Sequence, residues 1–126
     1  MFKDTQVFSG FSIDDPEAAR RFYGDVLGIE VEDGEMGGIL MLHFGGGGPP
    51  TIAYPKPDHV PAEFTILNFP VPDVETAVDA LVAKGVVFEV YGGDLPQDEK
   101  GIMRGHGPEI AWFKDPAGNI LSVIED

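Results

Sequence analysis

The chain has 126 residues, no cysteine and a formal net charge of −14, from 22 acidic and 8 basic residues. Disulfides and thiolate metal sites are therefore excluded, and nucleic acid is a poor partner because phosphate binding needs a surplus of Lys and Arg. The length predicts one domain spanning residues 1–126, and with neither a basic leader nor a long apolar run we expect a cytoplasmic protein that binds no membrane.

The first half of the chain, about residues 5–55, predicts a strand, a helix and three further strands. The apolar run Val7–Ile13 predicts the strand. Asp15 then suits a helix N-cap, and Pro16 suits the first helical position. Apolar residues recur at helical spacing until Gly28, which is typical of a helix end. Further apolar runs predict strands at residues 29–31, 39–44 and 51–54.

The second half, about residues 62–126, follows the same plan after a proline-rich linker at residues 55–61. A strand at residues 64–71 precedes Asp73, which suits an N-cap, and the helix that follows ends near Gly85. The segment DPAGN, residues 115–119, predicts a hairpin turn with proline at its second position. The remaining predicted elements are strands at residues 86–90, 110–114 and 120–124 and a long polar loop at residues 92–109.

The two halves also match residue by residue. Phe11 aligns with Phe69, Asp15 with Asp73, Glu17 with Glu75 and Ala19 with Ala77. This repeat predicts two βαβββ modules and an α+β fold with a mixed, curved sheet. We expect a ligand cleft between the two copies.

Three segments together resemble the vicinal oxygen chelate superfamily, which includes glyoxalase I, extradiol dioxygenases and bleomycin-resistance proteins. The segments are IDDPEAARRFYGDVLGIEV at residues 13–31, PVPDVETAVDALVAKGVVF at residues 70–88 and AWFKDPAGNILSVIE at residues 111–125. The resemblance implies two βαβββ modules that form a half-barrel, with ligands bound on its concave face. It also implies a homodimer, since family members often pair across exposed sheet edges.

The same resemblance places the family's metal ligands on the first and last strands of each module. The corresponding positions here are Phe8, Ile66 and Ser122, with the fourth near Ala53. Divalent metals need carboxylate or imidazole donors, and these side chains supply none. We therefore expect no metal and no other cofactor.

Alternation along the first strand of each half predicts that Phe8, Ser12, Ile66 and Asn68 face the concavity, where they would bind a ligand. Tyr54 and Trp112 are large aromatic residues on strands near the cleft, and Ser122 is a position that the resemblance implies. Packing as ordinary interior is the alternative for the same residues, and for the aromatic ones in particular. The candidate ligand-binding residues are Phe8, Ser12, Tyr54, Ile66, Asn68, Trp112 and Ser122.

Three functions remain open at this level. The first is a glyoxalase/bleomycin-resistance-like protein that lacks the usual metal ligands and binds a small cationic or aromatic molecule, which the acidic composition would attract; acidity that only keeps the chain soluble is the alternative. The second is a metal-dependent lyase, isomerase or dioxygenase that uses donors such as His43, His106 and Glu109. The third is a non-catalytic interaction module. The charged loop at residues 92–109 predicts either a lid over the cleft or a solvated surface loop.

Overall fold

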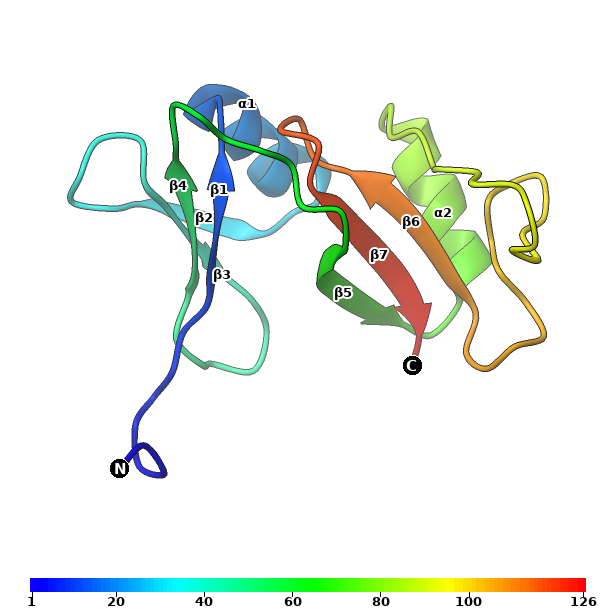
Figure 1. Cartoon of the computed structure of the whole chain (residues 1–126), viewed down its shortest axis with the longest axis horizontal. Helices are drawn as coiled ribbons and strands as arrows, with labels where there is room; N and C mark the ends of the chain where they lie inside the picture. The colour runs from blue at the N-terminus through cyan, green and yellow to red at the C-terminus, as the bar shows by residue number, and fades with distance from the viewer. The chain divides into compact units, whose positions relative to one another are not determined.

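The computed structural model describes all residues from Met1 to Asp126. The chain forms two compact units, Met1–Pro61 and Ala62–Asp126. Each unit has one mixed sheet and one helical segment, so the α+β prediction is confirmed (Figure 1). None of the helices has the length and apolarity needed to cross a membrane.

The first unit has a four-stranded sheet in the order β1-β4-β3-β2, in which β1 and β4 run parallel and the other pairs antiparallel. This is the predicted βαβββ order. The elements are β1 (Gly10–Ile13), α1 (Pro16–Arg20), the π-helical turn η1 (Arg21–Val26), β2 (Glu30–Asp33), β3 (Leu40–His43) and β4 (Thr51–Pro55).

The helical segment of this unit begins as the sequence predicts. The Asp15 carboxylate accepts a hydrogen bond from the Ala18 N–H at 3.2 Å, which satisfies a donor that has no partner within the helix. The segment then widens, because the Leu27 N–H bonds to the carbonyl of Phe22, five residues earlier. Its inner face buries Tyr23, whose ring centroid lies 5.9 Å from that of Phe11 on β1.

Strand β1 begins at Gly10, later than the predicted start at Val7. The last bond that joins this edge to β4 runs from the Ile52 N–H to the Ser9 carbonyl. Before Thr51, β4 is preceded by two prolines, which have no N–H to donate, and by four glycines. The ladder therefore has no partner for Val7 and Phe8, which stay 72% and 63% exposed.

The second unit has a three-stranded sheet in the order β5-β7-β6, with β5 and β7 parallel. Its core combines Phe113, Leu121 and Val123 from the sheet with Val74 and Val78 from the helix. The predicted hairpin joins β6 to β7, and Gly118 takes the left-handed φ of 86°. The elements are β5 (Thr65–Val71), α2 (Val74–Ala83), β6 (Ile110–Lys114) and β7 (Ile120–Glu125).

The strand predicted at residues 86–90 does not form. Phe88 makes a single isolated bridge to Phe113, and the Glu89 N–H bonds to the Trp112 carbonyl. After Glu89, the Gln97 side chain replaces a neighbouring strand as hydrogen-bond partner of this segment. Its NH₂ group donates to the Glu89 carbonyl at 3.0 Å, and its oxygen accepts from the Tyr91 N–H at 2.8 Å. Residues 86–90 therefore lie beside β6, as β2 lies beside β3 in the first unit, but they form no continuous ladder.

The predicted polar loop is fastened to α2 over residues 97–104 (Figure 1, where α2 is light green and the loop yellow). Lys100 pairs with Asp79 at 2.9 Å, and Arg104 pairs with Glu75 at 2.7 Å. Burial disfavours the charged form of Asp98, but bonds from the Ile102 N–H, the Arg104 guanidinium and the Lys100 N–H outweigh burial and lower its pKa. Ile102 is fully buried, so this stretch is a fixed part of the helix side of the unit.

The two helix caps predict a measurable loss when one is removed. Asp73 accepts from the Thr76 N–H at 3.3 Å, as Asp15 does in the first unit. Asp73→Ala is expected to lower the free energy of unfolding by about 1 kcal/mol, because that N–H loses its partner. Denaturant titration measures the loss, with Asp94→Ala, at an exposed loop carboxylate, as the control. A cost equal to the control's would exclude a capping role.

Candidate functional site

In the first unit, Ser12 and Tyr54 are cross-strand neighbours on the face of the sheet that the helix leaves uncovered. The Tyr54 ring lies near Gly10, where an added Cβ would stand 3.9 Å from the ring. Ser12 has a partner of its own, since its hydroxyl lies 2.6 Å from the Nδ1 of His59. This bond ties the linker to the first strand, a contact between distant residues that sequence spacing does not signal.

Two other predicted positions in this unit differ from the expectation. Phe8 lies before β1 and outside the sheet. Ala53 is fully buried opposite Leu40, on the face that the helix covers, so it does not line the open face. By register the open-face positions on β4 are Ile52 and Tyr54, and Ile52 pairs with Gly10 as Ser122 pairs with Asn68 in the second unit.

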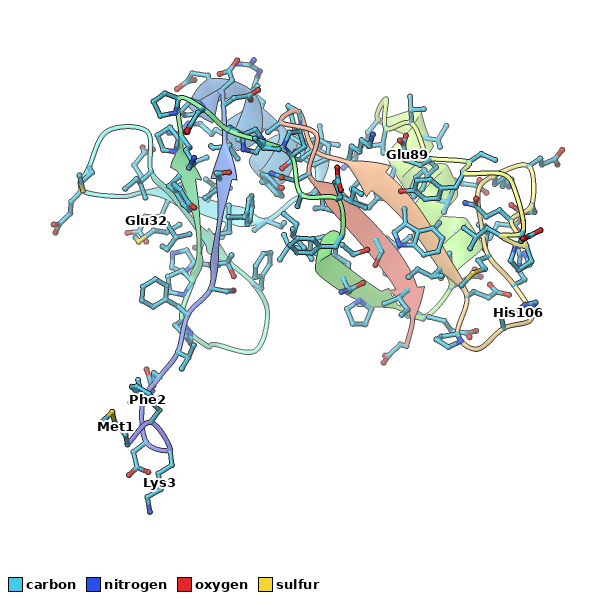
Figure 2. The ribbon with its side chains drawn as sticks, viewed as in Figure 1. Met1, Phe2, Lys3, Glu32, Glu89 and His106 are labelled. Atoms are coloured by element: carbon cyan, nitrogen blue, oxygen red, sulfur yellow. The ribbon has the colours of Figure 1, made fainter.

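The alternative metal donors have other partners. His43 Nε2 lies 2.8 Å from a Glu32 carboxylate oxygen, as an exposed pair between neighbouring strands (Figure 2 labels Glu32). In the second unit Glu109 accepts from the Arg104 guanidinium at 2.8 Å, and His106 is exposed in the loop. No group of three or more His, Asp or Glu side chains has an arrangement that could hold a metal ion.

In the second unit, three predicted residues stand in one row across the sheet. Asn68 on β5 is opposite Ser122 on β7, which in turn is opposite Trp112 on β6. The Ser122 hydroxyl donates to the Asn68 carbonyl oxygen at 2.6 Å, so both side chains lie on the same face. Ile66 falls in a register shift between Thr65 and Leu67 and has no cross-strand partner.

The row lies on the face opposite α2. Phe88 lines a groove together with Val78 of α2, and its ring packs on Phe113, so Phe113 points toward the helix. Side chains alternate along a strand, so Trp112 points to the other side. Ser122 is fully buried between its two neighbours, whereas Asn68 is exposed.

Three further side chains, which the sequence pattern did not single out, lie on the same face as this row. The Tyr91 ring meets Trp112 edge to face with centroids 5.8 Å apart. Glu89, labelled in Figure 2, is 27% exposed and pairs with Lys114 at 3.3 Å. The alternation of Glu89 and Tyr91 in the sequence was a usable signal. We call these six residues, Asn68, Glu89, Tyr91, Trp112, Lys114 and Ser122, the Trp112 face.

The chemistry of the Trp112 face is that of recognition. An indole beside a phenol offers flat apolar surface for stacking, and the amide and hydroxyl of Asn68 and Ser122 supply hydrogen bonds. Partial burial raises the pKa of Tyr91, the Glu89 carboxylate raises it further, and the Lys114 ammonium opposes both. The phenol therefore stays neutral and remains a hydrogen-bond donor at neutral pH.

The metal positions that the resemblance implies do not fit a divalent ion. Ala53, its open-face neighbour Ile52, and Ile66 all present carbon, and Phe8 lies outside the sheet. The Ser122 hydroxyl is a neutral donor that is already bonded to Asn68. Divalent first-row metals are held by imidazole, carboxylate or thiolate ligands, and these positions offer none of the three.

A family model for the Glyoxalase/Bleomycin resistance protein/Dioxygenase superfamily matches residues 8–123. No curated protein matches the chain.

Solved structures with a similar fold include TnmS3, an antibiotic binding protein from Streptomyces sp. CB03234, at 21% identity and a TM-score of 0.72 over 99% of this chain and 98% of that one. A superfamily member from Sphaerobacter thermophilus DSM 20745 is 21% identical, with a TM-score of 0.71 over 100% of both chains. A lactoylglutathione lyase from Agrobacterium tumefaciens is 19% identical, with a TM-score of 0.67 over 97% of this chain and 93% of that one. These likenesses concern the fold.

Proposed function

The chain belongs to the glyoxalase/bleomycin resistance protein/dioxygenase superfamily. We propose that its Trp112 face binds a small molecule that has a flat aromatic body and carries a positive charge. The observation that carries this proposal is the row Asn68, Ser122 and Trp112, with the partly buried Glu89 on the same face. The antibiotic-binding protein among the structures of similar fold supports a binding role.

Stacking on an indole favours a planar ligand, and the indole face also attracts a cation. Glu89 adds a carboxylate that is 27% exposed and therefore less screened than one in open water. Its partner Lys114 is 49% exposed, and its long side chain can swing away when a ligand cation replaces it. The net charge of −14 draws cations toward the chain as a whole.

We further propose that binding needs no divalent metal and that the protein acts as a homodimer. The first part is supported by the side chains at the positions that the resemblance implies: Ala53, its open-face neighbour Ile52, and Ile66 all present carbon. The second is supported by the edge strands β1 and β5, each of which pairs on one side only within its own sheet. Ser12 and Tyr54 remain the candidate ligand-binding residues of the first unit.

The single tryptophan makes this proposal directly testable. Proflavine, a planar cation, should quench Trp112 fluorescence and bind more tightly than acridine, which has a similar ring system but is neutral at pH 7.5. By calorimetry, Trp112→Ala should weaken proflavine binding about tenfold, the order expected for one lost stacking contact. Glu89→Gln should weaken the binding of proflavine and leave the binding of acridine unchanged.

Phe2→Ala is the matched control for Trp112→Ala, since Phe2 is 70% exposed and lies in the first unit. Proflavine binding should be the same with EDTA and with added Zn²⁺. Unchanged affinity in Trp112→Ala would refute the site, and a requirement for metal would refute the metal-free part of the proposal.

A further inference from the structure

The second unit has a groove on its helix side, separate from the Trp112 face. Its volume is about 370 Å³, within the range of small-molecule pockets. It lies between α2, the segment at residues 86–88 and the turn at residues 99–100. We name it the valine groove, after the residues that give it an apolar lining: Val78, Val82, Val86, Val87 and Phe88.

The floor of the valine groove is made of well-packed side chains. Val78 and Val86 are buried, at 1% and 8% exposure, and the Phe88 ring packs on the fully buried Phe113. The walls, in contrast, face water, because Val82 is 53% and Val87 is 76% exposed. Covering this apolar surface would release water from it, which is the main source of affinity for an apolar ligand.

The polar rim of the groove carries more negative than positive charge. The Lys100 ammonium lies 2.9 Å from Asp79 and 3.5 Å from Glu75, and the bond to Asp79 raises the pKa of Lys100. Glu75 also pairs with Arg104 at 2.7 Å and does not line the groove, so Lys100 and Asp79 form the one ion pair of the rim. Glu99 adds a second carboxylate to the rim, and its side chain is exposed and forms no salt bridge.

The wall that carries Glu99 is held in place before any ligand arrives. Asp98 accepts from the N–H groups of Lys100 and Ile102 at 2.9 Å each. Gly101 has a φ of 84°, and an added Cβ would stand 2.9 Å from the Glu89 carbonyl, so the turn packs directly on the neighbouring segment. A preformed wall reduces the ordering cost of binding.

We propose that the valine groove binds a small organic amine, with its apolar body over Val82, Val87 and Phe88 and its ammonium beside Glu99. The apolar lining and the negative rim match the two ends of such a molecule. This site is independent of the Trp112 face, because the two lie on opposite sides of the sheet: Phe88 and Phe113 point toward α2, and Trp112 points away from it.

Three probes with the same ring separate charge from apolar contact: 2-phenylethylamine, 2-phenylethanol and phenylacetate. Titrated into the full chain, the amine should shift the NMR signals of the Val82 and Val87 methyl groups at lower concentration than the alcohol. Phenylacetate should be the weakest. Glu99→Gln should bring the amine to the level of the alcohol, a change of about threefold to fivefold. Glu63→Gln, at an exposed carboxylate outside the groove, is the control.

Val82→Gln tests the apolar wall, and Val60→Gln is its control, since Val60 is also exposed (76%) but lies in the first unit. Only Val82→Gln should weaken all three probes. Equal binding of amine and alcohol to the unaltered chain, or no methyl shift up to concentrations on the order of 10 mM, would overturn the proposal. In Trp112→Ala the valine shifts should persist. Their loss would move the amine to the Trp112 face, refuting the groove site and leaving the proposed function intact.

Discussion

Asp115→Ala is expected to lower the free energy of unfolding by about 3 kcal/mol, because it removes the acceptor at the centre of a buried turn. Asp115 is 5% exposed and Asn119 is 2% exposed. One oxygen of the Asp115 carboxylate accepts from the N–H groups of Ala117 and Asn119 at 2.9 Å each. The other accepts from the Asn119 side-chain amide at 3.1 Å. Alanine would leave these buried donors without their acceptor.

The stability of Asp115→Asn should fall between that of the unaltered protein and that of Asp115→Ala. Its carbonyl oxygen can replace the oxygen that accepts two backbone bonds, but its NH₂ would then face the NH₂ of Asn119. Asn119 cannot simply turn over, because its own oxygen accepts from the Ala62 N–H at 3.1 Å. Chemical denaturation measures the series, with Asp4→Ala at an exposed carboxylate as the control. A loss below about 1 kcal/mol for Asp115→Ala would show that water replaces the carboxylate in this turn.

Phe113→Ala is expected to be the most destabilising single change, at about 4 kcal/mol. The Phe113 side chain is fully buried and lies 5.3 Å from Phe88, centroid to centroid. Its removal leaves a cavity in the core of the second unit. It also removes the ring against which the bridged segment at residues 86–90 packs.

Phe113→Leu keeps most of the volume and should cost about 1 kcal/mol. Phe64→Ala, at a phenylalanine that is 69% exposed, should change stability by less than about 0.5 kcal/mol. Thermal and denaturant unfolding measure all three variants. If Phe113→Leu retains stability but the Val87 methyl signals move, the packing on Phe88 also shapes the valine groove. A cost for Phe113→Ala no larger than for Phe64→Ala would show that the sheet and α2 do not share one core.

The local elements of this protein were predictable from its sequence because each depends on residues that are near neighbours. Asp15 and Asp73 cap helices that begin one residue later, and each bonds to a backbone N–H three residues ahead. Gly118 takes the left-handed conformation that its turn requires. Alternation along the first strands predicted the face on which Asn68 lies, and the register of the sheet sets Ser122 and Trp112 in one row with it.

The tertiary structure decided what depends on partners far along the chain. Register placed Ile52 on the open face and Ala53 in the core, and the four glycines before β4 hide that register in the sequence. Gln97 took the hydrogen bonds that a strand at residues 86–90 would have needed. The salt bridges between Glu89 and Lys114 and between Lys100 and Asp79 of α2 join residues that are far apart in the sequence. Caps and turns depend on hydrogen bonds within a few residues of the chain. Ladders, ion pairs and grooves form only when distant segments come together, and the sequence does not show which of several possible partners each backbone group or charge will have.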